Sequence, residues 1–131
     1  MTALSQALAI VEHVRTSAEE SGLRVSCSVV DAQGHEIVTM RMDRATWFTP
    51  GIARVKAQTA AALKRDTSAL GALREAFPDL LDQVGEQLSF TPTTLSGGVI
   101  HASGVAVGVS GAHPDQDVSL AKGAIAHVLD G

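Results

Sequence analysis

The sequence has little cysteine and few aromatic residues, and both shortages narrow the class of protein. Among 131 residues there is one cysteine, Cys27, no tyrosine, one tryptophan and three phenylalanines. A single cysteine cannot form an internal disulfide or a thiolate metal cluster, which favours a reducing, cytoplasmic setting. Because large rings usually fill much of a small core, alanine, valine and leucine must fill this one through close packing.

Long apolar runs and clusters of basic residues are also missing. No apolar run approaches the roughly 20 residues that a membrane-spanning helix needs, and the N-terminus lacks the basic-then-apolar pattern of a signal peptide. The net charge is -4, and the lysines and arginines are scattered, with Lys64-Arg65 as the only adjacent pair. We therefore expect a cytoplasmic protein with no membrane partner and no nucleic-acid partner.

The rest of the composition is that of a folded domain. Apolar residues make up 45% of the chain and charged residues 18%, which excludes a disordered chain, and 131 residues fit one domain spanning residues 1–131. Apolar residues at helical spacing over 4–18 predict a first helix that ends near Gly22. Residues 24–31 and 35–41 predict a hairpin of two strands around a turn at 31–34.

The rest of the chain is predicted to form further helices and a second hairpin. Thr49-Pro50 predicts the start of a second helix, with Thr49 as its N-cap, and this helix should run as far as Arg65. Two short helices follow, residues 99–110 predict a second hairpin, and a last helix begins near Asp115. The order α-β-β-α-α-α-β-β-α predicts an α+β fold, with an antiparallel sheet of about four to five strands flanked by helices.

Four segments along the chain together resemble the GlcG/HbpS family. They occur in the family's order and are Val29-Val30-Asp31 with Gly34, Arg41-Met42-Asp43, residues 52–60 with Lys56-Ala57, and Gly97-Gly98 followed by residues 108–112 and Asp117. The resemblance implies the fold just described and a homo-oligomer built from dimers. The family includes heme-binding and heme-degrading proteins and the PduO C-terminal-like domain, so the resemblance also makes heme a possible cofactor.

Arg41 and Asp43 share one face of the second predicted strand, and two methionines alternate with them. In a binding site, Arg41 would grip a carboxylate or a heme propionate while Asp43 orients its guanidinium group. In a structural role, the two side chains would form an ion pair that fixes the strand end to a helix. Under both interpretations we expect Arg41 and Asp43 to be paired or to lie in one polar network.

Lys56 lies on an alanine-rich helix and is a second candidate. As a functional residue it would project into a cavity, as a cation for an acidic ligand or as an amine of lowered pKa. As a structural residue it would lie on the surface or pair with Asp31 or Asp43. The backbone N–H groups of Gly97-Gly98 are a candidate anion site, although a glycine pair also suits a turn or bulge. The helix start at Thr49 is another candidate anion site.

The five histidines give no metal motif. No two of them have the helical spacing of a metal pair, and no cysteine or carboxylate completes a zinc spacing. We therefore predict no metal site, except that His101 would be the axial ligand of iron if heme binds. His101 is also a candidate general base, and an exposed structural histidine is the third interpretation.

Three functions remain open. The leading hypothesis is a small-ligand-binding protein for heme or another anionic small molecule, whose cavity is bounded by Arg41–Asp43, Lys56 and Gly97–His101. The second is a cofactor-independent small enzyme that acts on an organic acid by acid–base chemistry through Lys56, His101 or Asp43. The third is a structural or assembly subunit.

Overall fold

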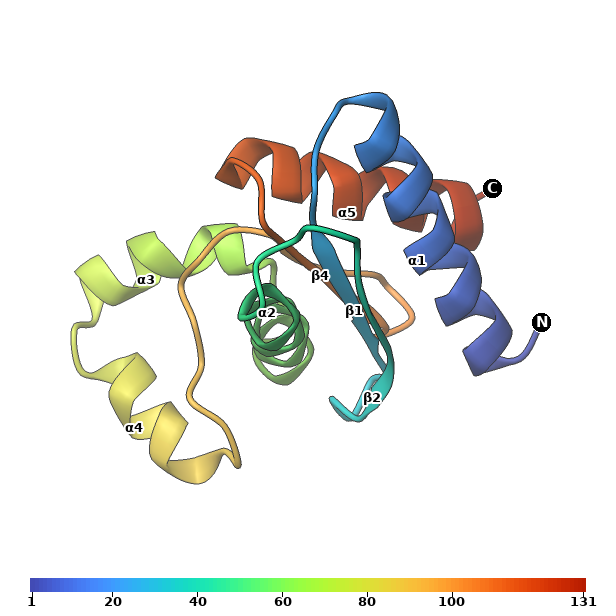
Figure 1. Cartoon of the computed structure of the whole chain (residues 1–131). Helices are drawn as coiled ribbons and strands as arrows, with labels where there is room; N and C mark the ends of the chain where they lie inside the picture. The colour runs from blue at the N-terminus through green and yellow to red at the C-terminus, as the bar shows by residue number, and fades with distance from the viewer.

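A four-stranded antiparallel sheet forms the centre of the molecule (Figure 1). The computed structural model describes residues 1–131. The strands are β1 (Ser26–Val30), β2 (Glu36–Arg41), β3 (Gly98–Ile100) and β4 (Ala106–Ser110), in the spatial order β2-β1-β4-β3. Ser26 lies opposite both Arg41 and Ser110, so the end of β2, the start of β1 and the end of β4 share one end of the sheet.

Helices cover both faces of the sheet. α1 (Ala3–Glu20) and α5 (Pro114–Leu129) pack side by side on one face, and α2 (Thr49–Leu63) lies on the other. A 3₁₀ turn (Thr67–Ala69), α3 (Leu70–Ala76) and α4 (Leu80–Gln87) connect α2 to β3. The predicted α+β class and element order are confirmed, with four strands in the sheet. None of the helices combines the length and apolarity needed to cross a bilayer.

The alternation in β1 divides its side chains between two packed faces, and all five of its residues are buried. Cys27 and Val29 join the larger apolar cluster with α1 and α5, while Val30 packs against the alanines of α2. A Cβ added to Gly108 in β4 would overlap the carbonyl oxygen of Ala53 in α2. The small side chains therefore let α2 lie directly on the sheet, as close packing of alanine and valine predicts.

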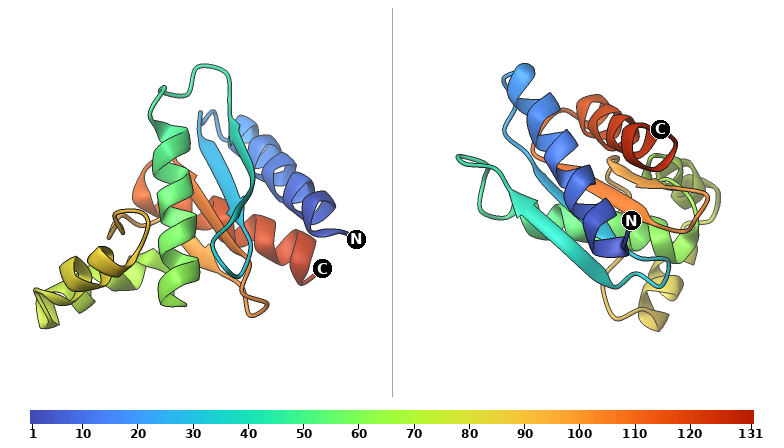
Figure 2. Two further views of the ribbon diagram at one scale, coloured as in Figure 1. Left: turned by 90° about the horizontal axis from the view of Figure 1, so that it is seen from below. Right: turned by 90° about the vertical axis from the view of Figure 1, so that its right-hand side faces the viewer.

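α3 and α4 project away from the sheet as an arm, which is clearest in the left view of Figure 2. Neither helix packs against a strand, and α3 contacts the 3₁₀ turn that precedes it. Phe77 at the end of α3 is 60% exposed and Leu80 at the start of α4 is 41% exposed. The arm therefore presents apolar side chains to solvent in the single chain.

The prediction of Thr49 as an N-cap is wrong. α2 begins at Thr49 itself, and the cap position is held by Phe48, which makes no side-chain capping bond. The buried hydroxyl of Thr49 donates instead to the carbonyl oxygen of Thr46 at 2.7 Å, and it therefore accepts a hydrogen bond from the Ser26 hydroxyl at 2.9 Å. Thr49 thus ties the first turn of α2 to β1.

Candidate functional site

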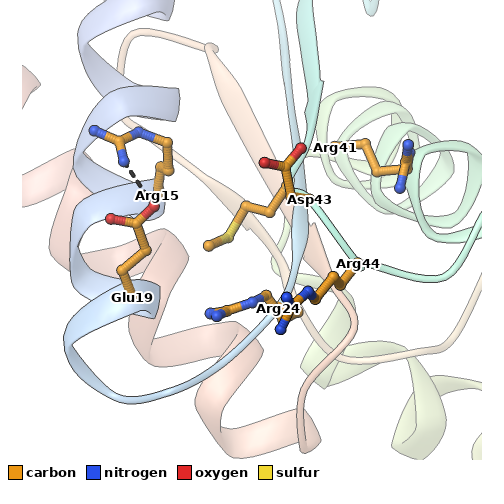
Figure 3. Close-up of a pocket in the computed structure, with 7 residues that line it drawn as sticks. Arg15, Glu19, Arg24, Arg41, Asp43 and Arg44 are labelled. Atoms are coloured by element: carbon orange, nitrogen blue, oxygen red, sulfur yellow. Dashed lines mark hydrogen bonds and ion pairs between the residues drawn. The ribbon is translucent and has the colours of Figure 1, made fainter.

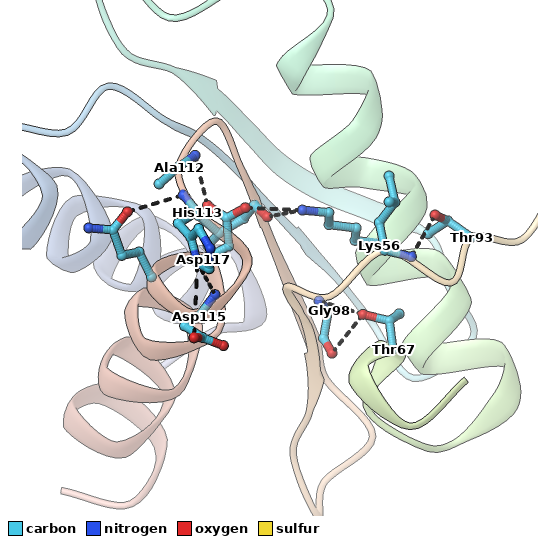
Figure 4. Close-up of polar contacts among 11 residues, drawn as sticks. Lys56, Thr67, Thr93, Gly98, Ala112, His113, Asp115 and Asp117 are labelled. Atoms are coloured by element: carbon cyan, nitrogen blue, oxygen red, sulfur yellow. Dashed lines mark hydrogen bonds and ion pairs between the residues drawn. The ribbon is translucent and has the colours of Figure 1, made fainter. Parts of the chain in front are cut away.

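Lys56 points from α2 toward the end of β4 and is almost fully buried, at 4% exposure. Its Nζ donates to the carbonyl oxygen of Val109 at 2.8 Å and lies 3.3 Å from Oδ2 of Asp117 in the first turns of α5 (Figure 4). Asp117 is 3% exposed, and its Oδ1 accepts a hydrogen bond from the N–H of Ala112 at 3.1 Å. The partner of Lys56 is therefore Asp117, and neither Asp31 nor Asp43, the two partners considered for a structural role, contacts it.

Burial dominates the electrostatics of this ion pair. It lowers the pKa of Lys56, while the charge of Asp117 opposes that change. It also raises the pKa of the Asp117 carboxyl, against the effects of Lys56 and of the Ala112 N–H. Both charges are removed from water and are compensated mainly by each other. The pair joins α2, β4 and α5, and Lys56 does not line any of the larger cavities.

The glycine pair serves the close packing of β3 against this ion pair. A Cβ on Gly97 would lie 2.9 Å from Nζ of Lys56, and one on Gly98 would overlap the Lys56 carbonyl oxygen. Gly97 also has φ of +124°, which side chains rarely tolerate. The N–H of Gly98 already donates to Oγ1 of Thr67 at 2.9 Å (Figure 4). The pair therefore provides room for Lys56, and the Gly98 amide has a partner within the chain.

A second group of charged residues surrounds an open cavity of about 490 Å³, which we call the arginine cavity. It lies where the end of α1 and the start of β1 meet the segment after β2 (Figure 3). Four of its seven lining residues are arginines, two are acidic, and Met42 is the only apolar one. The lining residues are Arg15, Glu19, Arg24, Arg41, Met42, Asp43 and Arg44.

The arginines differ in how far the chain neutralises them. Arg15 forms ion pairs with Glu12 and with Glu19, the latter at 2.7 Å. Nη1 of Arg41 donates to the carbonyl oxygen of Ala45 at 2.9 Å, so Arg41 does not form the predicted ion pair with Asp43. The physical reason is that the chain turns after Met42, and the Arg41 guanidinium group points away from the Asp43 carboxylate (Figure 3).

His101 lies at the opposite end of the sheet from the arginine cavity. It follows β3, and its N–H donates to the carbonyl oxygen of Val105 across the β3–β4 turn. Its Nδ1 is 2.8 Å from Oγ of Ser103, and its Nε2 is 2.7 Å from Oδ1 of Asp130. Both ring nitrogens are engaged within the chain.

The structure therefore does not gather all the predicted site residues in one place. Arg41 and Asp43 line the arginine cavity, whereas Lys56, Thr49 and the glycine pair form packing contacts between α2 and the sheet. No three His, Cys, Asp or Glu side chains cluster as metal ligands.

Several residues at the arginine cavity and beside His101 were not predicted from the sequence. Arg15, Arg24 and Arg44 join Arg41 at the cavity, and Ser103 and Asp130 flank His101. The hairpin signal could have found Arg24, because pairing Ser26 with Arg41 brings the residues before β1 beside those after β2. Arg15 and Asp130 gave no such signal, since their positions depend on how α1 and α5 pack on the sheet.

The protein is a small α+β domain with an open cavity that is lined mainly by arginines. The HbpS-like family model, described as haem degrading protein HbpS-like, matches residues 3–126, and the chain belongs to this family. The chain is also 30% identical to protein ORFY of Klebsiella pneumoniae, with a TM-score of 0.81, over 95% of this chain and 88% of that one.

Two further solved structures share this fold. HbpS of Streptomyces reticuli, solved as a double mutant, is 31% identical over 97% of this chain and 86% of that one, with a TM-score of 0.84. PduOC, solved as a complex with heme, is 29% identical over 95% of this chain and 93% of that one, with a TM-score of 0.81. Comparison with curated protein sequences gives no match.

Proposed function

We propose that the chain is a small-ligand-binding protein of the HbpS type and that the arginine cavity is its site. The ligand is an anionic small molecule, and heme is the first candidate, because PduOC has been solved with heme. The observation that supports this proposal is the gathering of four arginines from separate segments around one cavity of about 490 Å³. Small-molecule pockets usually measure about 300–1,000 Å³.

The balance of charge around the cavity favours an anion. Arg15 is already neutralised by its two glutamates. Arg24 donates only to the carbonyl oxygen of Leu23 and Arg41 only to that of Ala45, while Arg44 has no hydrogen-bond partner. These three guanidinium groups outnumber the carboxylate of Asp43, which is also unpaired. The planar guanidinium fork binds carboxylate and phosphate groups in two-point fashion.

The cavity fits one part of heme better than the other. Its free arginines suit the two propionates, but no histidine lines it. The sulfur of Met42 is buried and accepts a hydrogen bond from the N–H of Val25 at 3.5 Å. His101, the predicted iron ligand, lies at the other end of the sheet with both ring nitrogens engaged. The residues of one chain therefore fit the carboxylates and not the iron.

Titration with hemin and with iron-free protoporphyrin IX tests this proposal. Both molecules carry the same carboxylates, so both should bind the parent protein saturably. Arg41→Ala and Arg44→Ala should each weaken both affinities by about tenfold or more, since charged hydrogen bonds contribute about 1.5–3 kcal/mol. Arg74→Ala removes an equal charge from the arm and should leave them unchanged.

Three results would count against it. Absence of saturable binding to either porphyrin would reject heme, and binding that ignores the Arg41 and Arg44 variants would reject the cavity. Hemin binding lost in His101→Ala, with protoporphyrin binding kept, would instead assign iron ligation to His101.

We also propose that the chain forms a homo-oligomer built from dimers. Large apolar side chains are exposed in the segment before α2 and on the arm, with Trp47 at 83% and Phe77 at 60% exposure. Burying such side chains between copies would remove apolar area from water. Light scattering at micromolar concentration should give an even multiple of 13.5 kDa. A monomer alone would contradict the proposal.

A further inference from the structure

Three side chains at the β3–β4 turn form an array that the anion-binding proposal does not use. Ser103 and His101 belong to the turn itself, and Asp130 ends α5. Oγ of Ser103 is 2.8 Å from Nδ1 of His101, and Nε2 of His101 is 2.7 Å from Oδ1 of Asp130. A hydroxyl that contacts an imidazole, which in turn contacts a carboxylate, is the arrangement in which a general base activates a serine nucleophile.

The hydrogen bonds fix which nitrogen of His101 carries the proton. The backbone N–H of Ser103 donates to Nδ1 at 3.1 Å, so Nδ1 is the acceptor and the proton of the neutral ring lies on Nε2. Nε2 then donates to the Asp130 carboxylate. The N–H of Val105 donates to Oγ of Ser103 at 3.4 Å. The Ser103 hydroxyl can therefore direct its proton at Nδ1, which lies 2.8 Å away and is shared with the Ser103 N–H. The base is thus held in the tautomer that can accept this proton.

The turn that carries Ser103 is fixed by its surroundings. Gly104 has φ of +95°, and a Cβ there would lie 2.6 Å from Cβ of Ala32 in the β1–β2 turn. The N–H of Gly104 donates to the carbonyl oxygen of His101 at 2.9 Å. These contacts hold Ser103 against the imidazole, while its side chain remains at the surface.

A pocket of about 350 Å³ lies beside the array, and His101 is the member of the array that lines it. Ile100 and Ala102 give it apolar walls, His101 and Gly104 line it from the turn, and Lys64 is its only cationic lining residue. A short acyl chain would suit the apolar walls, and the lysine would favour negative charge that develops on a carbonyl oxygen.

From this geometry we propose that Ser103 is a nucleophile activated by His101, which hydrolyses short-chain esters. Oγ of Ser103 attacks the ester carbonyl carbon while its proton passes to Nδ1. The adduct expels the alcohol, which takes that proton and leaves an acyl group on Ser103. Asp130 stabilises the transient imidazolium ion. Water then attacks the acyl carbon with the same proton relay, and the carboxylic acid is released as Oγ regains its proton.

Acetylation by p-nitrophenyl acetate, located by peptide mass spectrometry, tests the proposal. The parent protein should acquire an acetyl group on Ser103 and release nitrophenol continuously. His101→Ala should slow both by about a hundredfold or more, the usual scale of general-base assistance, and Asp130→Asn should slow them less. Ser89→Ala, which removes an exposed serine that follows α4, should change neither rate.

Two results would overturn the proposal. One is acetylation of Ser103 no faster than that of Ser89 in the parent protein. The other is acetylation of Ser103 at an unchanged rate in both His101→Ala and Asp130→Asn, with thermal melting showing that these variants are folded. Because Ser103 lies far from the arginine cavity, Ser103→Ala should leave porphyrin binding intact, so the two proposals fail independently.

Discussion

Nζ of Lys56 lies 3.3 Å from Oδ2 of Asp117, in a position where neither side chain is more than 5% exposed. Three elements depend on this contact, because Lys56 comes from α2, Asp117 from α5, and the shared carbonyl oxygen of Val109 from β4. A buried charge that loses its partner remains desolvated and uncompensated. The ion pair is therefore a structural lock whose two halves must be present or absent together.

Removing one half of the lock should destabilise the fold strongly. Lys56→Met or Asp117→Asn alone should lower the free energy of unfolding by about 3–5 kcal/mol, a large part of the total for a domain of this size. The double variant Lys56→Met/Asp117→Asn should be more stable than either single variant, because it leaves no isolated charge. Urea unfolding of the four proteins checks this, and additive losses in the double variant would contradict it.

The lock also predicts how stability depends on pH. Burial raises the pKa of Asp117 above 3.8, so the folded chain binds the carboxyl proton more tightly than the unfolded chain does. The free energy of unfolding should therefore fall as pH rises from 3.8 to the raised pKa. Burial lowers the pKa of Lys56 below 10.5, so the free energy of unfolding should rise with pH between the lowered value and 10.5.

The measurement is the difference in free energy of unfolding between the parent and Lys56→Met/Asp117→Asn across this range. Groups common to both proteins cancel in the difference. The difference, parent minus double variant, should be smallest at intermediate pH, where both side chains are charged. It should increase toward low pH and toward high pH, where one of them is neutral. A maximum at intermediate pH would show that attraction between the two charges outweighs their burial.

The order of elements could be predicted from sequence because it depends on local patterns. Helical spacing over 4–18, the Asp31–Gly34 turn and the Val99–Ser110 hairpin each determine the conformation of a few neighbouring residues. Residue types alone also singled out Lys56 and His101 as unusual. Their partners, Asp117 and Asp130, lie 61 and 29 residues away in sequence, and only the packing of α5 on the sheet brings them near.

The cavity was predicted in part for the same reason. Arg41 ends β2 and Asp43 follows it, so the pairing of the β1–β2 hairpin places both residues beside the start of β1. Strand spacing suggested an ion pair between Arg41 and Asp43, but the turn after Met42 separates the two side chains. Gly97 to His101 runs along β3 away from the arginine end of the sheet, which places His101 at the opposite end from the cavity.

Gly108 should tolerate no side chain. Its neighbour across the sheet face is the backbone of α2, which a Cβ would overlap at Ala53. Gly108→Ala should therefore lower the free energy of unfolding by about 3 kcal/mol or more, at or above the usual range for overpacking. Gly71→Ala is the matched control, because a Cβ there meets nothing within 4 Å, and in α3 it should raise stability by about 0.5–1 kcal/mol. Thermal melting of both variants distinguishes the close contact from a general intolerance of alanine.

Arg44 should show opposite effects on stability and on ligand binding. It has φ of +70°, a conformation that costs a residue with a Cβ about 1–2 kcal/mol, and it lines the cavity with a guanidinium group that has no hydrogen-bond partner. Arg44→Gly should therefore raise the free energy of unfolding of the ligand-free protein by about 0.5–1 kcal/mol. It should also weaken porphyrin binding by about tenfold or more, because the ligand loses one charged donor.

Lys64→Gly provides the control for the Arg44 variant. Lys64 also has positive φ, at +55°, but it ends α2 and lies outside the arginine cavity. Its replacement should give a similar gain in stability and leave porphyrin affinity unchanged. Residues held in costly backbone conformations cluster at functional sites, where the strain is offset by what the side chain does. If Arg44→Gly and Lys64→Gly affect binding equally, or if Arg44→Gly destabilises the protein, then Arg44 is held in place for packing rather than for a ligand.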